Sequence, residues 1–378
     1  MKVAFFQPYL ANWRIEFLEY FTEKYKNGEV IVYDGGFGGK NDTKSVSGNL
    51  AKFKFSKLFS ASPVLKFKGQ AYPFYFSPFL IFHLIKDKPD VIITEGEINF
   101  INNISIFFYC KVFGKDYVWW SLGKVRTRNK NIINKLLDPV VDFLLVHAKC
   151  VMARNTLAKE YYTAEKGLHG STVIIAPNSM NHHKEGDSSF DTKQELNKIK
   201  KNSKVMLYVG ALTDLKRPKD LVLALVLLLK NNPDLDVQLW FVGDGPERQK
   251  LESLVKELNL EGYVTFFGKI FGGVGAYFEV SDFVVVPGLG GLVINHAMIY
   301  GKPVISRLAD GTELDLIEDG LTGFLVDGYQ IETLVEKILL IIDSDLPEMS
   351  KLCLNKVSEQ WNIDIMYERT LQCVTFKR

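Results

Sequence analysis

The stretch Val286-Pro-Gly-Leu-Gly-Gly-Leu-Val-Ile-Asn-His-Ala-Met-Ile-Tyr-Gly-Lys-Pro-Val-Ile-Ser306 decides the fold. A hydrophobic strand ends at Pro287, three glycines form a turn, and a helix is predicted to begin near Leu292. A second strand follows at residues 303–306. The first turn of a helix leaves its amides unpaired and carries partial positive charge, and glycines let a ligand approach the main chain. This arrangement predicts a site for a phosphate or a sugar, although an ordinary strand-turn-helix crossover has the same pattern.

The rest of the chain repeats the strand-helix pattern in two halves. At 378 residues the chain is too long for one core and fits two domains. Short apolar runs rich in β-branched and aromatic residues predict strands that are buried on both faces. The expected strands are Val3–Phe6, Val30–Tyr33, Val91–Thr94, Tyr117–Trp120, Phe143–Val146, Val173–Ala176, Val205–Val209, Val237–Val242, Val264–Phe267, Phe283–Val286, Val304–Ser306 and Phe324–Val326.

Helices are predicted between these strands, for example at residues 13–24 and 220–229, where apolar residues have helical spacing. Alternating strands and helices predict parallel sheets covered by helices on both faces. A polar linker, residues 178–191, interrupts the alternation. We therefore predict an α/β fold with two Rossmann-like domains that face each other across a cleft. The expected parts are residues 1–180, residues 195–355 and a C-terminal helix at 356–378 that packs back toward the first domain.

The bulk composition is that of a globular protein, with 47% hydrophobic and 24% charged residues. The apolar stretches are too short and too polar to cross a bilayer, and the first residues are expected to form a buried strand instead of a signal peptide. The four cysteines form no Cys-x-x-Cys pair, which favours a reduced, cytoplasmic protein without a metal site.

The charge is unevenly distributed along the chain. Residues 1–180 contain 24 lysines and arginines and 15 acidic residues, a net of +9, whereas the remainder has 22 basic and 29 acidic residues, a net of −7. The segment Lys52–Lys68 interleaves lysines with phenylalanines and contains no acid. Such a segment can bind an anionic membrane surface and insert its rings, although a solvated lysine face has the same composition.

Several motifs resemble glycosyltransferases of the GT-B fold, sequence family 4, whose members retain the anomeric configuration. The opening stretch is similar to the family's Gly-rich turn, and Trp240-Phe-Val-Gly-Asp-Gly-Pro-Glu247 is very close to its Val-Gly-Asp-Gly-Pro-Glu element. Tyr208 to Leu221 resembles its Gly-Arg-Leu turn and lysine. Gly311 to Val326 is similar to its closing motif. The resemblance covers the second half throughout and the first half only loosely.

The resemblance implies a metal-independent site for a nucleotide-sugar donor in the second half, with a UDP-sugar preferred over a GDP-sugar and no cofactor. Lys216 is expected to place a cation on the diphosphate, and backbone amides near the glycine turn to add hydrogen bonds. The expected donor-binding residues are Gly210, Arg217, Gly243, Gly268, Lys269, Gly288, Gly290, Gly291 and Leu292.

Four customary side chains of the family are replaced in this sequence. Ala211 stands in place of the arginine of the Gly-Arg-Leu turn, and Leu122 in place of a histidine. Gly288 and His296 occupy the positions of two glutamates that are eight residues apart. His296 is expected to bond a ribose hydroxyl, and packing inside the helix is the alternative. Arg217 is a candidate to replace the missing arginine.

The first half offers acceptor-side candidates at the ends of predicted strands. His147 is expected to follow the strand Phe143–Val146 and to contribute to catalysis. The other candidates are Tyr9, Arg14, Glu95, Ser121, Lys124 and Arg126.

The sequence thus predicts a retaining glycosyltransferase that transfers a sugar from a nucleotide sugar to a glycan or lipid-linked glycan in surface polysaccharide synthesis. It is expected in the cytoplasm, peripherally on the inner face of the membrane, with no nucleic-acid partner. Two alternatives remain open: a catalytically silent protein of this fold that binds a partner or glycan, and a nucleotide-sugar epimerase.

Overall fold

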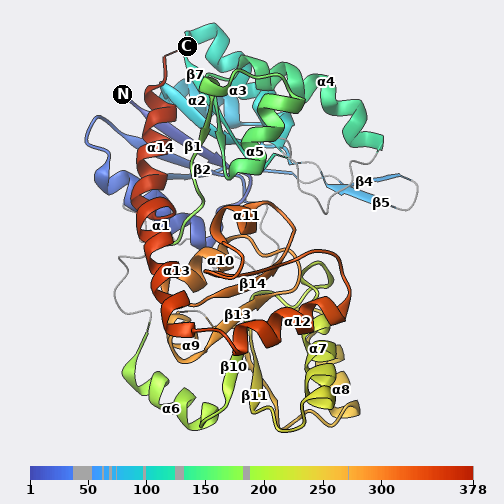
Figure 1. The fold of residues 1–378 in the computed structure, drawn as a ribbon. Helices are drawn as coiled ribbons and strands as arrows, with labels where there is room; N and C mark the ends of the chain where they lie inside the picture. The colour runs from blue at the N-terminus through green and yellow to red at the C-terminus, as the bar shows by residue number, and fades with distance from the viewer. Residues whose placement is uncertain are drawn as a thin grey trace. The chain divides into compact units, whose positions relative to one another are not determined.

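The chain divides into two compact units in a computed structural model that describes residues 1–36, 53–61, 64–67, 70–73, 75–96, 99–123, 132–181, 188–270 and 272–377 (Figure 1). Unit 1 is Met1–Lys124, Arg128–Met180 and Ile363–Arg378. Unit 2 consists mainly of Asn181–Asn362. The C-terminal residues therefore return to the unit that contains the N-terminus.

Unit 1 is built on a parallel sheet. Within the described ranges its strand order is β3-β2-β1-β6-β7-β8-β9, and every pairing is parallel. The strands are β1 (Val3–Gln7), β2 (Val30–Asp34), β3 (Lys54–Lys57), β6 (Val91–Glu95), β7 (Asp116–Ser121), β8 (Cys150–Ala153) and β9 (Val173–Ile175). A separate antiparallel pair is formed by β4 (Val64–Phe67) and β5 (Gln70–Pro73). The prediction of doubly buried strands is confirmed, because β1, β7 and β8 are buried almost throughout.

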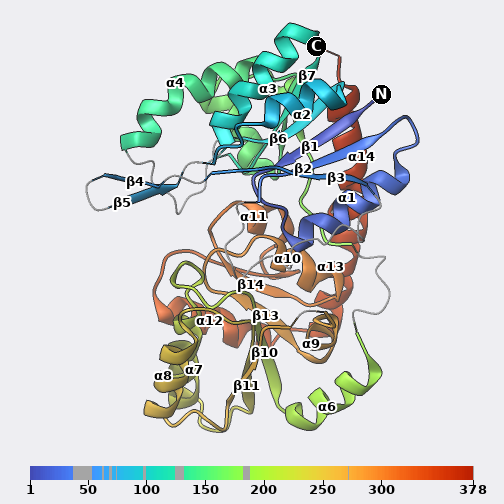
Figure 2. The same cartoon turned by 180° about the vertical axis from the view of Figure 1, so that it is seen from behind.

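Helices cover both faces of this sheet, and each face has its own apolar cluster. On one face lie α1 (Asn12–Lys24) and α14 (Ile363–Thr375), which cross and contact each other (Figures 1 and 2). Tyr20 and Lys24 of α1 both bond Asp364 of α14. On the other face lie α2 (Leu80–Asp87), α3 (Phe100–Phe113), α4 (Ile132–His147) and α5 (Thr156–Glu160).

The predicted strand Phe143–Val146 is wrong, because these residues form the end of helix α4. Leu144 and Leu145 are buried, while Phe143 and Val146 are 50% and 42% exposed. A short apolar run does not by itself distinguish a strand from a helix. Packing against α3 decides the matter here, since it buries one side of the segment and leaves the other in solvent.

The lysine- and phenylalanine-rich segment is partly a core strand. Phe53 is 6% exposed and Phe55 packs against the same apolar cluster as α1, so neither ring is available to insert into a membrane. Lys54 on β3 forms ion pairs with Asp87 and Glu29. The prediction that these two rings insert is therefore wrong, whereas Phe59 is 67% exposed. Lys52 and Lys68 lie outside the described residues.

Unit 2 repeats the architecture with a second parallel sheet, whose described strand order is β12-β11-β10-β13-β14-β15. Its strands are β10 (Lys204–Val209), β11 (Val237–Val242), β12 (Val264–Gly268), β13 (Phe283–Val286), β14 (Val304–Arg307) and β15 (Gly323–Val326). Its helices are α6 (Phe190–Lys200), α7 (Pro218–Asn231), α8 (Arg248–Glu257), α9 (Gly275–Val280), α10 (Leu292–Ile299), α11 (Thr312–Leu316), α12 (Ile331–Ile342) and α13 (Leu346–Gln360). The helix predicted from Leu292 is confirmed.

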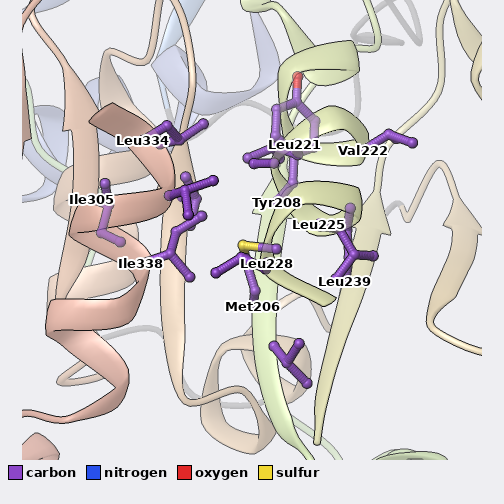
Figure 3. Close-up of a cluster of buried hydrophobic side chains, with 14 of the residues drawn as sticks. Met206, Tyr208, Leu221, Val222, Leu225, Leu228, Leu239, Ile305, Leu334 and Ile338 are labelled. Carbon is purple, nitrogen blue, oxygen red and sulfur yellow. The ribbon is translucent and has the colours of Figure 1, made fainter. Parts of the chain in front are cut away.

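Apolar packing on both faces holds unit 2 together. Helices α7, α8 and α12 cover one face, and α6, α9, α10 and α13 cover the other. Figure 3 shows Leu221, Leu225 and Leu228 of α7 in the first cluster, together with Leu334 and Ile338 of α12. All five side chains are fully buried. No helix in the described part of the chain is long and apolar enough to cross a membrane.

We expect Leu225→Ala to lower the free energy of unfolding by about 2–5 kcal/mol, because it leaves a void in a closely packed cluster. Urea denaturation measures the change. Leu340→Ala on α12 is the control, since Leu340 is 49% exposed and its truncation should have a much smaller effect. Equal losses for the two variants would contradict the packing described here.

Candidate functional site

The candidate site of unit 2 lies at the carboxyl edge of its sheet, where β10 and β13 are neighbours. From β10 the chain continues to β11 on one side, and it reaches β13 on the other side only after β12. Ligands of open parallel sheets bind at such a switch point. The loops that follow these two strands carry the predicted residues Lys216 and Gly288–Gly291.

One backbone and one side-chain hydrogen bond join these two loops. The amide of Leu289 donates to the carbonyl of Leu215 at 3.3 Å. Lys216 Nζ donates to the carbonyl of Leu289 at 3.1 Å. A Cβ at position 288 would lie 2.7 Å from the Leu215 oxygen, so only glycine fits there without movement of the backbone. Gly288 therefore serves the contact between the loops, and a glutamate at this position would disrupt it.

Lys216 is the candidate cation of the site. It follows β10 in a short 3-10 turn, Asp214–Lys216, and its side chain is half-buried beside Gly210. A Cβ on Gly210 would lie 3.6 Å from Lys216 Nζ, in ordinary contact, so the two residues are neighbours. Burial lowers the pKa of Lys216, and the charge of Asp310 opposes this shift. An anionic ligand beside Lys216 would raise the pKa of this lysine, as Asp310 does, and so favour its charged form.

The N-terminus of α10 faces the same loop. Gly291 precedes the helix with φ of +66°, a conformation that favours glycine, and no side chain caps the helix. A Cβ on Gly291 would lie 3.5 Å from Asp310 Oδ2. Asp310 is 4% exposed, and its Oδ1 accepts a hydrogen bond from Thr312 N. Sequence reasoning missed Asp310, because no motif marks it and only the fold brings it to Gly291 and Lys216.

Glu313 fixes the loop that carries Asp310. Its carboxylate is 1% exposed and accepts hydrogen bonds from the amides of Ala309 at 2.7 Å and Gly311 at 3.1 Å. Burial raises the pKa of Glu313, and these backbone hydrogen bonds oppose the shift. The residue is therefore a positioning group with its acceptor atoms directed at the loop backbone.

Ion pairs among Arg217, Asp220 and Arg307 support the two loops at the switch point. Arg217 donates from Nε to Asp220 Oδ2 at 2.8 Å, and the buried Arg307 donates to the same oxygen. Arg307 also donates to the carbonyl of Pro287 at 3.3 Å. The guanidinium of Arg217 lies over the ring of Tyr329, 4.4 Å from its centroid. Arg217 is thus held beside Lys216, but an acidic partner already occupies part of its guanidinium.

The remaining donor-site candidates lie along the same edge on other strands. Gly243 follows β11 and packs directly on the backbone of Gly210, which explains the need for glycine there. Gly268 ends β12 with φ of +73°, and a Cβ on it would lie 3.8 Å from Arg248 Nη1. Lys269 is exposed. Because β12 is two strands from β10, this corner lies roughly 10 Å from the Lys216 loop.

His296 packs among aromatic rings on helix α10. Its ring centroid lies 4.6 Å from that of Phe278 and 5.6 Å from that of Tyr300. Gly290 has a local packing role as well, since a Cβ there would lie 2.5 Å from Val286 Cγ1. The structure therefore gathers Lys216, Gly210 and Gly288–Leu292 at one point, and places His296 one turn further along α10.

In unit 1 the acceptor-side candidates gather at the corresponding switch point, between β1 and β6. Arg14 Nη2 donates to Glu95 Oε1 at 3.2 Å. Arg154, which sequence reasoning missed, donates to the same oxygen at 3.0 Å. The pKa of Tyr9 is raised by burial and by Glu95. Ser121 is buried, and its Oγ accepts from Gly123 N at 2.9 Å. Lys124 and Arg126 lie outside the described residues.

His147 does not belong to this cluster. It ends helix α4, its Nδ1 is 2.7 Å from the Phe143 carbonyl, and its ring packs on Phe143 and Phe107. Strand β8 begins only at Cys150, so His147 precedes the amino end of that strand. The predicted position of His147 at a carboxyl strand end is therefore wrong, because the strand on which it depended is a helix.

Among the residues that the structure describes, no group of three or more His, Cys, Asp or Glu side chains could hold a metal ion. The four cysteines are buried and free.

We expect Arg307→Met to lower the free energy of unfolding by about 3–5 kcal/mol, because it removes a buried partner of Asp220. Arg217→Met is the matched control, since Arg217 contacts the same carboxylate but its side chain is 37% exposed. Its loss should be about 0–1 kcal/mol. Chemical denaturation of both variants distinguishes the two roles, and an equally small effect of both would refute the supporting role of Arg307.

The second half of the chain is similar to known glycosyltransferases. Residues 189–356 match the family model "Glycosyl transferases group 1". A D-inositol 3-phosphate glycosyltransferase of Pseudarthrobacter chlorophenolicus is 32% identical over 130 residues, which cover 33% of this chain and 31% of that protein. An uncharacterized glycosyltransferase of Haemophilus influenzae is 29% identical over 243 residues, 60% of this chain and 64% of that protein. The chain thus spans about a third of the length of the first curated relatives it matches.

Solved structures resemble the whole chain. Anabaena HepE in complex with UDP has a TM-score of 0.76 at 18% identity and covers 99% of this chain and 100% of its own. HepE was also solved with UDP-glucose, with a TM-score of 0.72 at 18% identity and 99% of each chain covered. WaaG, a glycosyltransferase involved in lipopolysaccharide biosynthesis, has a TM-score of 0.68 at 16% identity and covers 99% of this chain and 100% of its own. The chain therefore has the GT-B fold, and its residues 189–356 are similar to the glycosyl transferases group 1.

Proposed function

We propose that this protein is a retaining glycosyltransferase that transfers a sugar from a nucleotide sugar to a glycan or lipid-linked glycan. The observation that carries the proposal is that Lys216 and the uncapped N-terminus of α10 lie close together at the β10–β13 switch point. Lys216 bonds the carbonyl of Leu289, in the turn that leads into α10. A cation and free helical amides at one point suit a diphosphate. In this proposal Lys216, Gly291 and Leu292 bind the donor diphosphate, and Asp310 faces the donor sugar.

The chemistry of transfer suits this arrangement. The nucleoside diphosphate departs as an anion, and preorganised donors lower the barrier when they face charge that develops in the transition state. The leaving phosphate can itself take the proton of the acceptor hydroxyl, so no general-base carboxylate is required. A carboxylate at position 288 is therefore not needed for this reaction, and the contact of Gly288 with the Leu215 backbone leaves no room for one.

The donor is proposed to be a UDP-sugar and the reaction to be independent of metal. The UDP and UDP-glucose complexes of HepE support the choice of base, since that protein shares the fold. Lys216 and the α10 amides supply the positive charge that a metal would otherwise bring to the diphosphate. We place the reaction in surface polysaccharide synthesis at the cytoplasmic face of the membrane, in line with the involvement of WaaG in lipopolysaccharide biosynthesis.

Two alternatives differ in measurable ways. A silent binding protein is favoured by Ala211, which replaces the family's arginine and is exposed beside the site. Such a silent protein would either bind no nucleotide or bind a nucleotide sugar without transferring its sugar. An epimerase would bind nucleotide but interconvert free nucleotide sugars without an acceptor.

We expect UDP to raise the melting temperature by roughly 5–10 °C at a hundred times its Kd, with or without EDTA, because it binds only folded protein. GDP, ADP and CDP should shift it less.

Lys216→Ala should remove the UDP-induced shift and lower turnover at least about a hundredfold, as loss of one transition-state donor does. Thermal melting and release of UDP from UDP-sugars measure the two effects.

Lys219→Ala is the matched control, since Lys219 is an exposed lysine three residues away on α7. It should retain both the shift and the activity. A full UDP shift in Lys216→Ala would refute the role of this lysine, and no shift with any nucleotide would favour the silent protein.

We also propose that unit 1 contacts an anionic membrane surface. Phe59, Phe79 and Phe82 are 67%, 50% and 64% exposed, and the ring centroid of Phe79 lies 6.0 Å from Phe59 and 6.4 Å from Phe82. Lys57 and Lys86 are exposed in the same segments. Adjacent exposed rings with nearby lysines suit insertion at a bilayer interface.

We expect the triple variant Phe59→Ser, Phe79→Ser, Phe82→Ser to lose at least about tenfold in affinity for phosphatidylglycerol vesicles in a sedimentation assay, because interfacial binding scales with the apolar area that is buried. Phe190→Ser is the control, since Phe190 in unit 2 is 70% exposed. Unchanged binding of the triple variant would refute this surface.

A further inference from the structure

Two of the four cysteines are neighbours in the core of unit 1. Cys150 begins strand β8, and Cys373 lies in the last turn of helix α14. Their side chains are 2% and 0% exposed and belong to the same apolar cluster. Cys150 Sγ donates to the carbonyl of Cys373 at 3.6 Å, although the two residues are 223 positions apart in the sequence. Burial and a hydrogen bond with the Cys150 thiol raise the pKa of Cys373, so the two thiols are themselves in contact.

The other two cysteines have different surroundings. Cys110 lies in the apolar cluster on the opposite face of the unit 1 sheet. Cys353 belongs to unit 2, where its Sγ donates to the carbonyl of Thr322 at 3.4 Å. A disulfide forms only between cysteines whose backbones are close and whose side chains point together. The fold of unit 1 therefore selects Cys150 and Cys373 as a pair.

The last turn of α14 is held on β8 by polar contacts as well as by apolar packing. Lys149 Nζ donates to the carbonyl of Val374 at 3.3 Å, and Thr370 Oγ1 lies 3.5 Å from Met152 Sδ. These contacts fix the two cysteines relative to each other while the helix is docked. The chain returns to unit 1 through α14 after it has formed unit 2, so a bond between the two sulfur atoms would close a ring of chain that includes unit 2.

The reactivity of the pair depends on whether the last turn of α14 is docked. A thiol reacts as its thiolate, and burial disfavours the charged thiolate. In the docked state the pair is therefore protonated and shielded from solvent. Helix ends open locally, and α14 ends at Thr375, within a turn of Cys373. Opening of this turn exposes the thiols to a small oxidant, and redocking returns the sulfur atoms to contact.

We infer that Cys150 and Cys373 form an oxidative cross-linking site that joins helix α14 covalently to strand β8. In this reaction each thiol loses one proton and each sulfur atom one electron, and an S–S bond forms between them. A two-electron oxidant takes up the protons and electrons: a peroxide is reduced to two molecules of water, and the diazene diamide to the corresponding hydrazine. The cross-link makes the return of the chain to unit 1 covalent under oxidising conditions.

The test is treatment of the purified full-length protein with diamide, followed by thiol counting in denaturant and peptide mapping without reductant. Wild type should fall from four free thiols to two, with one linked peptide pair that contains Cys150 and Cys373. Cys150→Ala and Cys373→Ala should each keep their three remaining thiols. Cys110→Ala and Cys353→Ala are the matched controls, since both also remove a buried cysteine, and each should still lose two thiols.

The melting temperature tests whether the bond fits the docked helix. Oxidised wild type should melt roughly 5 °C above the same protein after reduction, because closing a long loop restricts the unfolded chain. Cys373→Ala should show no such difference.

Four thiols remaining in wild type after diamide treatment would overturn the inference. A linked peptide that joins any other pair of cysteines, or a cross-link between two molecules, would do the same. A lower melting temperature after oxidation would show that the bond displaces α14 and would also overturn the site. If Cys150→Ala does not fold, Cys373→Ala provides the same thiol count from the helix side.

Discussion

The parallel order of both sheets is the constraint on which the rest of the structure depends. Every strand pairing of the two large sheets is parallel, so all carboxyl strand ends of a unit meet at one edge. Return connections must then cross a face of the sheet, and the helices that make them bury both faces. In each unit the strand order reverses once, between β1 and β6 or between β10 and β13. Both clusters of polar side chains lie at these reversals.

The two clusters hold their positive groups in different ways. In unit 2 the positive groups are one half-buried lysine and the amides of α10. The loops that carry them are joined by hydrogen bonds to backbone carbonyls, and the Arg307–Asp220 ion pair supports them. In unit 1 the positive groups are two arginines fixed by Glu95 and Trp120. In the proposed function the lysine and the α10 amides face a diphosphate that leaves as an anion.

Much of the fold could be predicted because its local signals agree with the tertiary result. The doubly buried strands read as apolar runs, and the glycine turn with its helix from Leu292 is encoded within a few residues. The failures occurred where local and tertiary signals differ. Phe143–Val146 is an apolar run that becomes helical through contact with α3, and Phe53 is a lysine-flanked ring that strand pairing draws into the core. The predicted position of His147 was wrong because it depended on a strand at Phe143–Val146.

The sequence by itself determined the α/β class, the strand-turn-helix at 286–306 and the candidate lysine, because each depends on residues close together in the chain. Only the tertiary structure decided which distant groups meet. Asp310 reaches Gly291 through the pairing of β13 with β14, and Arg154 reaches Glu95 through the order of β6, β7 and β8. It also decided that Gly288 accommodates the Leu215 backbone. Such contacts are set by strand order and packing, which no local pattern of residues encodes.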